Sequence, residues 1–232
     1  GGFGLPGEAV DWNFVAQQAD VCDELVATKS GNERRYCIDG VIDTGAGADA
    51  IRDALLLAMA GSYTETGGVV KAYPGKFRPP VANFGEDAIV GSLQYDPLLD
   101  DSNRMDGVRG VMIAEAAKWQ PVEFPVVGDA DTNDRVLDIE LPFTKSPAAA
   151  QRIAKILLRR SQAQRSLACS LNMSGLRHEC LDNVVIHHPR YPHVGNLTWR
   201  ITSWQIAGDF SISITANEES PEFYEWDVSE ER

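Results

Sequence analysis

The most strongly patterned segment of this chain is Asp138-Ile-Glu-Leu-Pro-Phe-Thr-Lys-Ser-Pro-Ala-Ala-Ala-Gln-Arg-Ile-Ala-Lys-Ile-Leu-Leu-Arg-Arg160. Ser146 can accept a hydrogen bond from a free amide at a helix start, and Pro147 suits the first helical position because its missing N–H needs no partner there. Apolar residues then recur at helical spacing, at Ala150, Ile153, Ala154, Leu157 and Leu158. Polar residues cover the other face: Gln151, Arg152, Lys155, Arg159 and Arg160. The segment predicts an amphipathic helix over about residues 147–162, against which a sheet packs.

The residues before Pro79-Pro80 predict a small α/β domain, residues 1–78, because a proline pair cannot continue a hydrogen-bonded strand. Asp11 and Asp49 can cap its two helices, and Gly61 can end the second one. The expected elements are a helix from Asp11 to Glu24, a polar loop from Lys29 to Glu33, a strand from Arg34 to Ile42, a helix from Ala50 to Ala60, and a hairpin from Tyr63 to Tyr73 that turns at Gly67-Gly68.

Residues 79–232 predict a second, β-rich domain that contains the central helix. We expect a long loop over Trp119–Asp134 and an acidic tail over Glu218–Arg232 that connects to a part of the protein absent from this chain. The expected strands are Ala88–Leu93, Gly107–Ile113, Arg165–Leu171, Asn183–His188, and a hairpin over Thr198–Ala216 that turns at Gly208-Asp209. The predicted fold class is α+β: a small α/β unit followed by a β-barrel-like or sandwich-like domain with one packed amphipathic helix.

The composition is that of a globular protein, with 44% hydrophobic and 24% charged residues. The net charge of -13 argues against nonspecific binding to nucleic acid or anionic lipid, since both require a cationic surface. No apolar run approaches the roughly 20 residues that span a bilayer, and no signal peptide is recognisable. Because the chain begins Gly1-Gly2-Phe3 without a methionine, we expect it to be an internal fragment of a longer protein.

Two sets of residues could carry metal or redox chemistry. Cys22, Cys37, Cys169 and Cys180 are irregularly spaced, which predicts free and mostly buried thiols in a reducing compartment. His178, His187, His188 and His193 have ligand-type side chains, but their spacing with Cys180 matches no zinc module. We therefore predict no metal, cofactor or catalytic site, and leave open whether the histidines bind a metal.

The most enzyme-like motif is Val41-Ile42-Asp43-Thr44-Gly45-Ala46. It resembles the active-site loop of retropepsin-like aspartic proteases, in which two such aspartates share a proton. A dimer could supply the second carboxylate, but no second Asp-Thr-Gly occurs and a helix is expected directly afterwards. We favour a strand-to-helix connector, and keep a dimeric aspartic protease using Asp43, or a tail-associated hydrolase, as alternatives.

The order of several segments resembles the hub region of tail-tip proteins of long-tailed phages. These are the lambda-like tip attachment (J-type) proteins and the related prophage and gene-transfer-agent hubs. The matching pieces are Gly4–Gly7 with Asp11-Trp12 and Phe14, Ala19–Leu25, Arg35-Tyr36, Gly40–Thr44, Asp53–Gly61, Gly67-Gly68, Tyr73–Gly75, Pro79, Asp138–Thr144 and Ala150–Leu158. The chain departs from the pattern at Leu181-Asp182-Asn183, where such hubs often carry Gly-Asp.

The resemblance implies a structural protein of a phage or prophage-derived tail tip or baseplate hub, not an enzyme. It implies a trimeric ring that acts in tail assembly, tube closure and host attachment. The implied partners are further copies of the chain, distal tail proteins and other tail-tip proteins. The implied location is the virion tail, assembled in the host bacterial cytoplasm. The β-rich domain would then be a hub domain.

Overall fold

The computed structural model describes residues 7–43, 45–98, 104–128 and 135–232, and shows an α+β protein with curled β-sheets. Within these residues the chain forms three α-helices, and the predicted fold class is confirmed. The chain divides into two compact units. Unit 1 comprises Gly1–Lys76, Met105–Arg159 and Tyr224–Arg232, and unit 2 comprises Phe77–Arg104 and Arg160–Phe223. Each unit combines separate pieces of the chain. The division into domains 1–78 and 79–232 stays a prediction.

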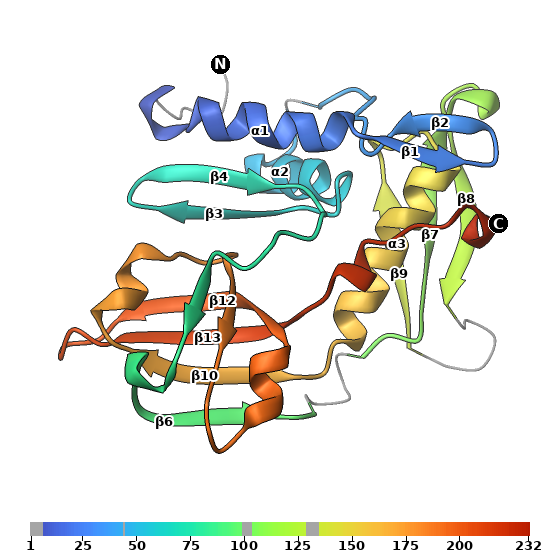
Figure 1. Ribbon diagram of the computed structural model, residues 1–232. Helices are drawn as coiled ribbons and strands as arrows, with labels where there is room; N and C mark the ends of the chain where they lie inside the picture. Colours follow the sequence, from blue (N-terminus) through green and yellow to red (C-terminus); the bar gives the residue numbers. More distant parts are fainter. Residues whose placement is uncertain (1–6, 44, 99–103, 129–134) are drawn as a thin grey trace. The chain divides into compact units, whose positions relative to one another are not determined.

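The N-terminal part of unit 1 contains two helices and two hairpins (Figure 1): α1 (Trp12–Asp23), β1 (Leu25–Thr28), β2 (Gly31–Arg34), α2 (Ala48–Leu57), β3 (Ser62–Thr66) and β4 (Val69–Tyr73). Asp11 caps α1 as predicted, and its Oδ1 accepts the Phe14 N–H at 3.0 Å. The predicted turn at Gly67-Gly68 is also confirmed. Both glycines have positive φ, 61° and 78°, the left-handed conformation that a tight hairpin turn requires.

The predicted strand over Arg34–Ile42 is wrong. Strand β2 lies earlier, over Gly31–Arg34, so the predicted polar loop is part of a hairpin with β1. The amides that follow bond to single carbonyls elsewhere: Arg35 N–H to Glu24, Tyr36 N–H to Cys22 and Asp39 N–H to Phe143. Without a neighbouring strand the alternating pattern forms no ladder, and Val41 is 92% exposed.

The ends of helix α2 also differ from the prediction. Gly47 is the N-cap, and Asp49 lies in the first turn, where its negative charge still suits the helix dipole. At the other end Ala60, not Gly61, takes the left-handed conformation, with φ of 46°. The Gly61 amide then closes the helix by donating to Leu56 O at 2.8 Å.

A three-stranded sheet completes unit 1, with strand order β8-β7-β9. Its strands are β7 (Gly107–Ala114), β8 (Gln120–Gly128) and β9 (Val136–Leu141), with β7 antiparallel to β8 and parallel to β9. The predicted loop over Trp119–Asp134 is therefore wrong where β8 runs; residues 129–134 lie outside the described residues. Pro121 and Pro125 are tolerated because β8 is an edge strand, whose outer amides need no ladder partner.

Helix α3 (Pro147–Gln162) matches the predicted helix, and groups with unit 1 up to Arg159. Ser146 Oγ accepts the Ala149 N–H at 3.2 Å, which confirms the predicted cap. Its apolar residues Ala150, Ile153 and Ala154 are fully buried, in a core shared with Val108 of β7 and Leu141 of β9. The helix therefore covers one face of the β8-β7-β9 sheet.

Unit 2 is built on a six-stranded sheet of order β5-β11-β12-β13-β10-β6. The strands are β5 (Ala82–Phe84), β6 (Ile89–Asp96), β10 (Ser166–Leu171), β11 (Asn183–Ile186), β12 (Thr198–Ile206) and β13 (Ile212–Glu219). The strands predicted in these regions are confirmed, including the β12–β13 hairpin. The core lies on one face of the sheet, where Trp199, Ile201 and Ile212 are fully buried.

Candidate functional site

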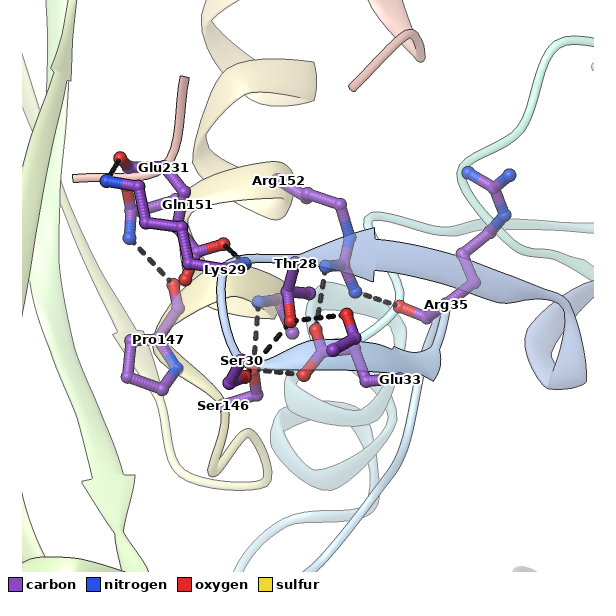
Figure 2. Close-up of polar contacts among 12 residues, drawn as sticks. Thr28, Lys29, Ser30, Glu33, Arg35, Ser146, Pro147, Gln151, Arg152 and Glu231 are labelled. Carbon is purple, nitrogen blue, oxygen red and sulfur yellow. Dashed lines mark hydrogen bonds and ion pairs between the residues drawn. The ribbon is translucent and has the colours of Figure 1, made fainter. Parts of the chain in front are cut away.

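The polar face of α3 is the most elaborate side-chain arrangement of unit 1 (Figure 2). Gln151 and Arg152 lie on the predicted polar face of the helix, yet they are only 1% and 4% exposed. The β1–β2 hairpin and the C-terminal segment Tyr224–Arg232 supply their polar partners. Both segments are distant from α3 in the chain, so the helical pattern alone could not reveal this cover.

Arg152 is held from two directions. Its Nη1 donates to Glu33 Oε1 at 2.7 Å, and its Nη2 donates to the Arg35 carbonyl at 2.8 Å. The other Glu33 oxygen accepts the Ser146 hydroxyl at 2.7 Å. Because Ser146 also caps α3, the Glu33 carboxylate links the β1–β2 hairpin to the start of the helix and to its second turn (Figure 2).

The C-terminal segment Tyr224–Arg232 packs on α3. Gln151 Oε1 accepts the Arg232 N–H at 2.9 Å, and Lys155 Nζ donates to the Glu225 carbonyl at 2.8 Å and to Glu230 Oε2 at 2.6 Å. Lys29 adds a bond from its N–H to Glu231 Oε2 at 2.7 Å, and its ammonium donates to the Glu231 carbonyl. These contacts hold the segment against the helix.

We expect Arg152→Ala to lower the free energy of unfolding by about 3 kcal/mol. The change leaves Glu33 Oε1 and the Arg35 carbonyl without their hydrogen-bond donor beside a buried helix face. Urea denaturation followed by circular dichroism measures the loss. The matched control is Arg159→Ala on the exposed side of the same helix, which should change stability by less than about 0.5 kcal/mol. Equal effects of the two substitutions would contradict a structural role for the Arg152 network.

Unit 2 contains an open pocket with a volume of about 590 Å³. Its walls are β5, the short helix η2 (Glu86–Ala88) and the short helix η5 (Met173–Arg177) with the adjoining His178. The lining mixes apolar and charged groups: Ala82, Phe84, Ala88 and Met173 with Asp87, Arg177 and His178. It has the size and mixed chemistry of a binding pocket.

The four histidines that the sequence analysis left open lie in unit 2 but serve different contacts. The His178 ring packs edge-on against Phe84, with Nδ1 at 3.7 Å from Asp182 Oδ2. His188 Nδ1 accepts the Arg190 N–H at 3.2 Å, and His193 packs against Tyr95. The imidazole of His187 faces Gly195, where there is no room for a Cβ atom. Across the described residues, no three His, Cys, Asp or Glu side chains come together as a metal site would require.

The Asp43 carboxylate belongs to a turn at the surface of unit 1. Its Oδ1 accepts the Gly45 N–H at 2.8 Å, and the Asp43 carbonyl accepts the Ala46 N–H at 3.1 Å. Thr44 lies outside the described residues. The aspartate therefore shapes the connection that leads into α2, as the connector interpretation expects.

All four cysteines are free thiols. Cys169 is buried, Cys22 and Cys180 are half-buried, and Cys37 is exposed, so the expectation of mostly buried thiols is wrong for Cys37. Burial raises the pKa of Cys169 to about 12, which keeps this thiol protonated and unreactive. The described part of the chain has no helix with the length and apolar character to cross a membrane.

The chain resembles two solved structures of virus-like and tail proteins in fold. One is a chain of the virion of a native gene transfer agent particle, with a TM-score of 0.66 and 16% identity over 85% of this chain and 44% of that one. Another is a tail protein from Neisseria meningitidis MC58, with a TM-score of 0.53 and 13% identity over 96% of this chain and 69% of that one. The chain therefore spans less than half the length of the gene-transfer-agent chain.

No curated protein sequence matches this chain. A family model does match, that of the Phage-tail_3 family, described as "Putative phage tail protein", and it covers residues 48–204. The matched region is more than half of the 232 residues and includes α2, the β8-β7-β9 sheet, α3 and most of the unit 2 sheet. The chain therefore belongs to this family of phage tail proteins.

Proposed function

We propose that this chain is a structural component of the tail tip or baseplate hub of a phage or prophage-derived particle. The observation that carries the proposal is the family match over residues 48–204. The fold shared with a chain of a gene transfer agent virion supports it, since the sequence resemblance described above includes gene-transfer-agent hubs. In this role the chain acts through assembly with other tail proteins and not through turnover of a substrate.

We further propose that copies of the chain form a trimeric ring, which contacts distal tail proteins and takes part in tube closure and host attachment. An acidic chain suits such a ring, because a net charge of -13 gives DNA passing through the tail no cationic surface to adhere to. Exposed apolar side chains such as Trp119, at the turn between β7 and β8, offer contact surface for neighbouring proteins.

Immunogold electron microscopy of intact particles tests the position. With an antibody raised against the purified chain, we expect gold at the tail end remote from the head, and a three-fold ring at that place in averaged images. Particles lacking the tail serve as the control and should remain unlabelled. Labelling along the head or the whole tail tube would contradict the tip assignment, and a ring of another symmetry would contradict the trimer.

A further inference from the structure

The tip of the β12–β13 hairpin in unit 2 presents a large apolar side chain to solvent. Phe210 is 70% exposed and has a φ of 62°, in the left-handed region. Backbone hydrogen bonds close the turn around it: Phe210 N–H donates to Ala207 O at 3.0 Å, and Ala207 N–H donates to Ser211 O at 2.8 Å. Asp209 Oδ1 accepts both the N–H and the hydroxyl of Ser211, at 3.0 and 2.7 Å.

This turn breaks a local rule of hairpin chemistry. A turn followed by a left-handed residue normally places glycine at the left-handed position, because a side chain there is strained. Here the glycine of the turn, Gly208, has no positive φ, while Phe210 occupies the left-handed position. The chain thus accepts backbone strain and an exposed aromatic ring at one residue, and neither stabilises the fold. Such local violations are typical of functional positions.

The charges beside the tip and in the pocket are complementary. Hydrogen bonds from Ser211 hold the pKa of Asp209 below its usual range, so the carboxylate next to Phe210 stays ionised. The guanidinium of Arg177, on the η5 wall of the unit 2 pocket, makes no hydrogen bond or ion pair with any other residue that the structure describes. Asp87 lies on the η2 wall of the same pocket. An entering carboxylate would therefore be attracted to the η5 side, by Arg177, and repelled from the η2 side.

We propose that the tip of the β12–β13 hairpin docks into the unit 2 pocket of a second copy of this chain. Phe210 enters among Ala82, Phe84 and Met173, and Asp209 pairs with Arg177. A pocket of about 590 Å³ has room for a phenyl ring and its neighbouring carboxylate. The hairpin tip and the pocket are different surfaces, so the contact is heterologous, and such contacts form a ring when the rotation between copies closes. The inference rests on the proposed function, which supplies the premise that copies of the chain contact one another.

Sedimentation velocity of the purified chain over a concentration series tests the contact. We expect the parent chain to self-associate, and Phe210→Gly to weaken the association at least about 30-fold, as loss of a central interface residue does. Leu98→Gly is the matched control, because it removes an equally exposed apolar side chain from the same unit and should leave association unchanged. Phe210→Gly should also raise the melting temperature by about 2–4 °C, since glycine relieves the left-handed strain.

A mixing experiment tests whether the hairpin tip of one copy binds the pocket of another. Ser174→Trp fills the pocket from its η5 wall and should be monomeric, as should Phe210→Gly. In the mixture, Ser174→Trp supplies an intact hairpin tip and Phe210→Gly supplies an intact pocket. The two variants should therefore form a one-to-one complex. A monomeric parent chain, unchanged association of Phe210→Gly, or no complex in the mixture would each overturn the contact. If immunogold labels the tail tip and any of these results is also obtained, the proposed function stands and only this contact is overturned.

Discussion

Replacing Ile153 with Asp is expected to remove most of the stability of unit 1. Ile153 is 0% exposed and lies at the centre of the core that α3 shares with β7 and β9. An aspartate there would place a carboxylate among apolar side chains such as Val108 and Leu141. It must either ionise without a partner or take up a proton, and both cost free energy.

We expect a loss of about 4–5 kcal/mol in the free energy of unfolding, a large share of the 5–15 kcal/mol typical of a whole protein. Urea denaturation followed by circular dichroism measures it. Ile153→Val is the matched control: it removes one methylene group at the same place and should cost about 1 kcal/mol. If the Asp variant unfolds at the same urea concentration as the parent chain, Ile153 is not in the core and the packing of α3 on the sheet is wrong.

Trp199→Ala should cause a comparable loss in unit 2. The indole of Trp199 is fully buried, and its Nε1–H donates to the Val194 carbonyl at 3.0 Å. Its ring also meets Tyr95 nearly at right angles, at 6.2 Å between ring centroids. The substitution leaves a cavity and an unpaired carbonyl, so we expect a loss of about 4–5 kcal/mol.

The same denaturation experiment measures this loss, with Trp119→Ala as the control. Trp119 is half exposed at the β7–β8 turn, so its removal should cost less than about 1 kcal/mol. Because the two tryptophans differ in burial and not in residue type, the comparison isolates the contribution of packing. Equal losses would show that Trp199 does not anchor the core of unit 2.

The elements that the sequence predicted correctly carry their signals within a few residues. Asp11 caps α1, Ser146 and Pro147 begin α3, and Gly67-Gly68 turn the β3–β4 hairpin, each by chemistry that acts on neighbouring amides. The mistaken elements lack such signals. The strand expected over Arg34–Ile42 has an alternating pattern but no partner strand, and β8 contains prolines that only its edge position makes acceptable.

The same contrast applies to the sites. No sequence pattern indicated the unit 2 pocket, because β5 and η5 meet only after the sheet has brought residues 82–84 near residues 173–177. On the polar face of α3, Arg152 pairs with Glu33, which lies 119 residues earlier in the chain. A partner at that distance contributes nothing to the local pattern of hydrophobic and polar residues.

The sequence by itself determined the α+β class, the helix at Pro147–Gln162 and its apolar face, the Gly67-Gly68 turn, and the resemblance to phage tail proteins. Only the tertiary structure decided that the opposite face of α3 is also buried, that the C-terminal segment packs there, and that Phe210 stands at a strained tip. The physical reason is that helix periodicity, capping and turn geometry depend on near neighbours, whereas burial and ion pairing depend on which distant segments fold together.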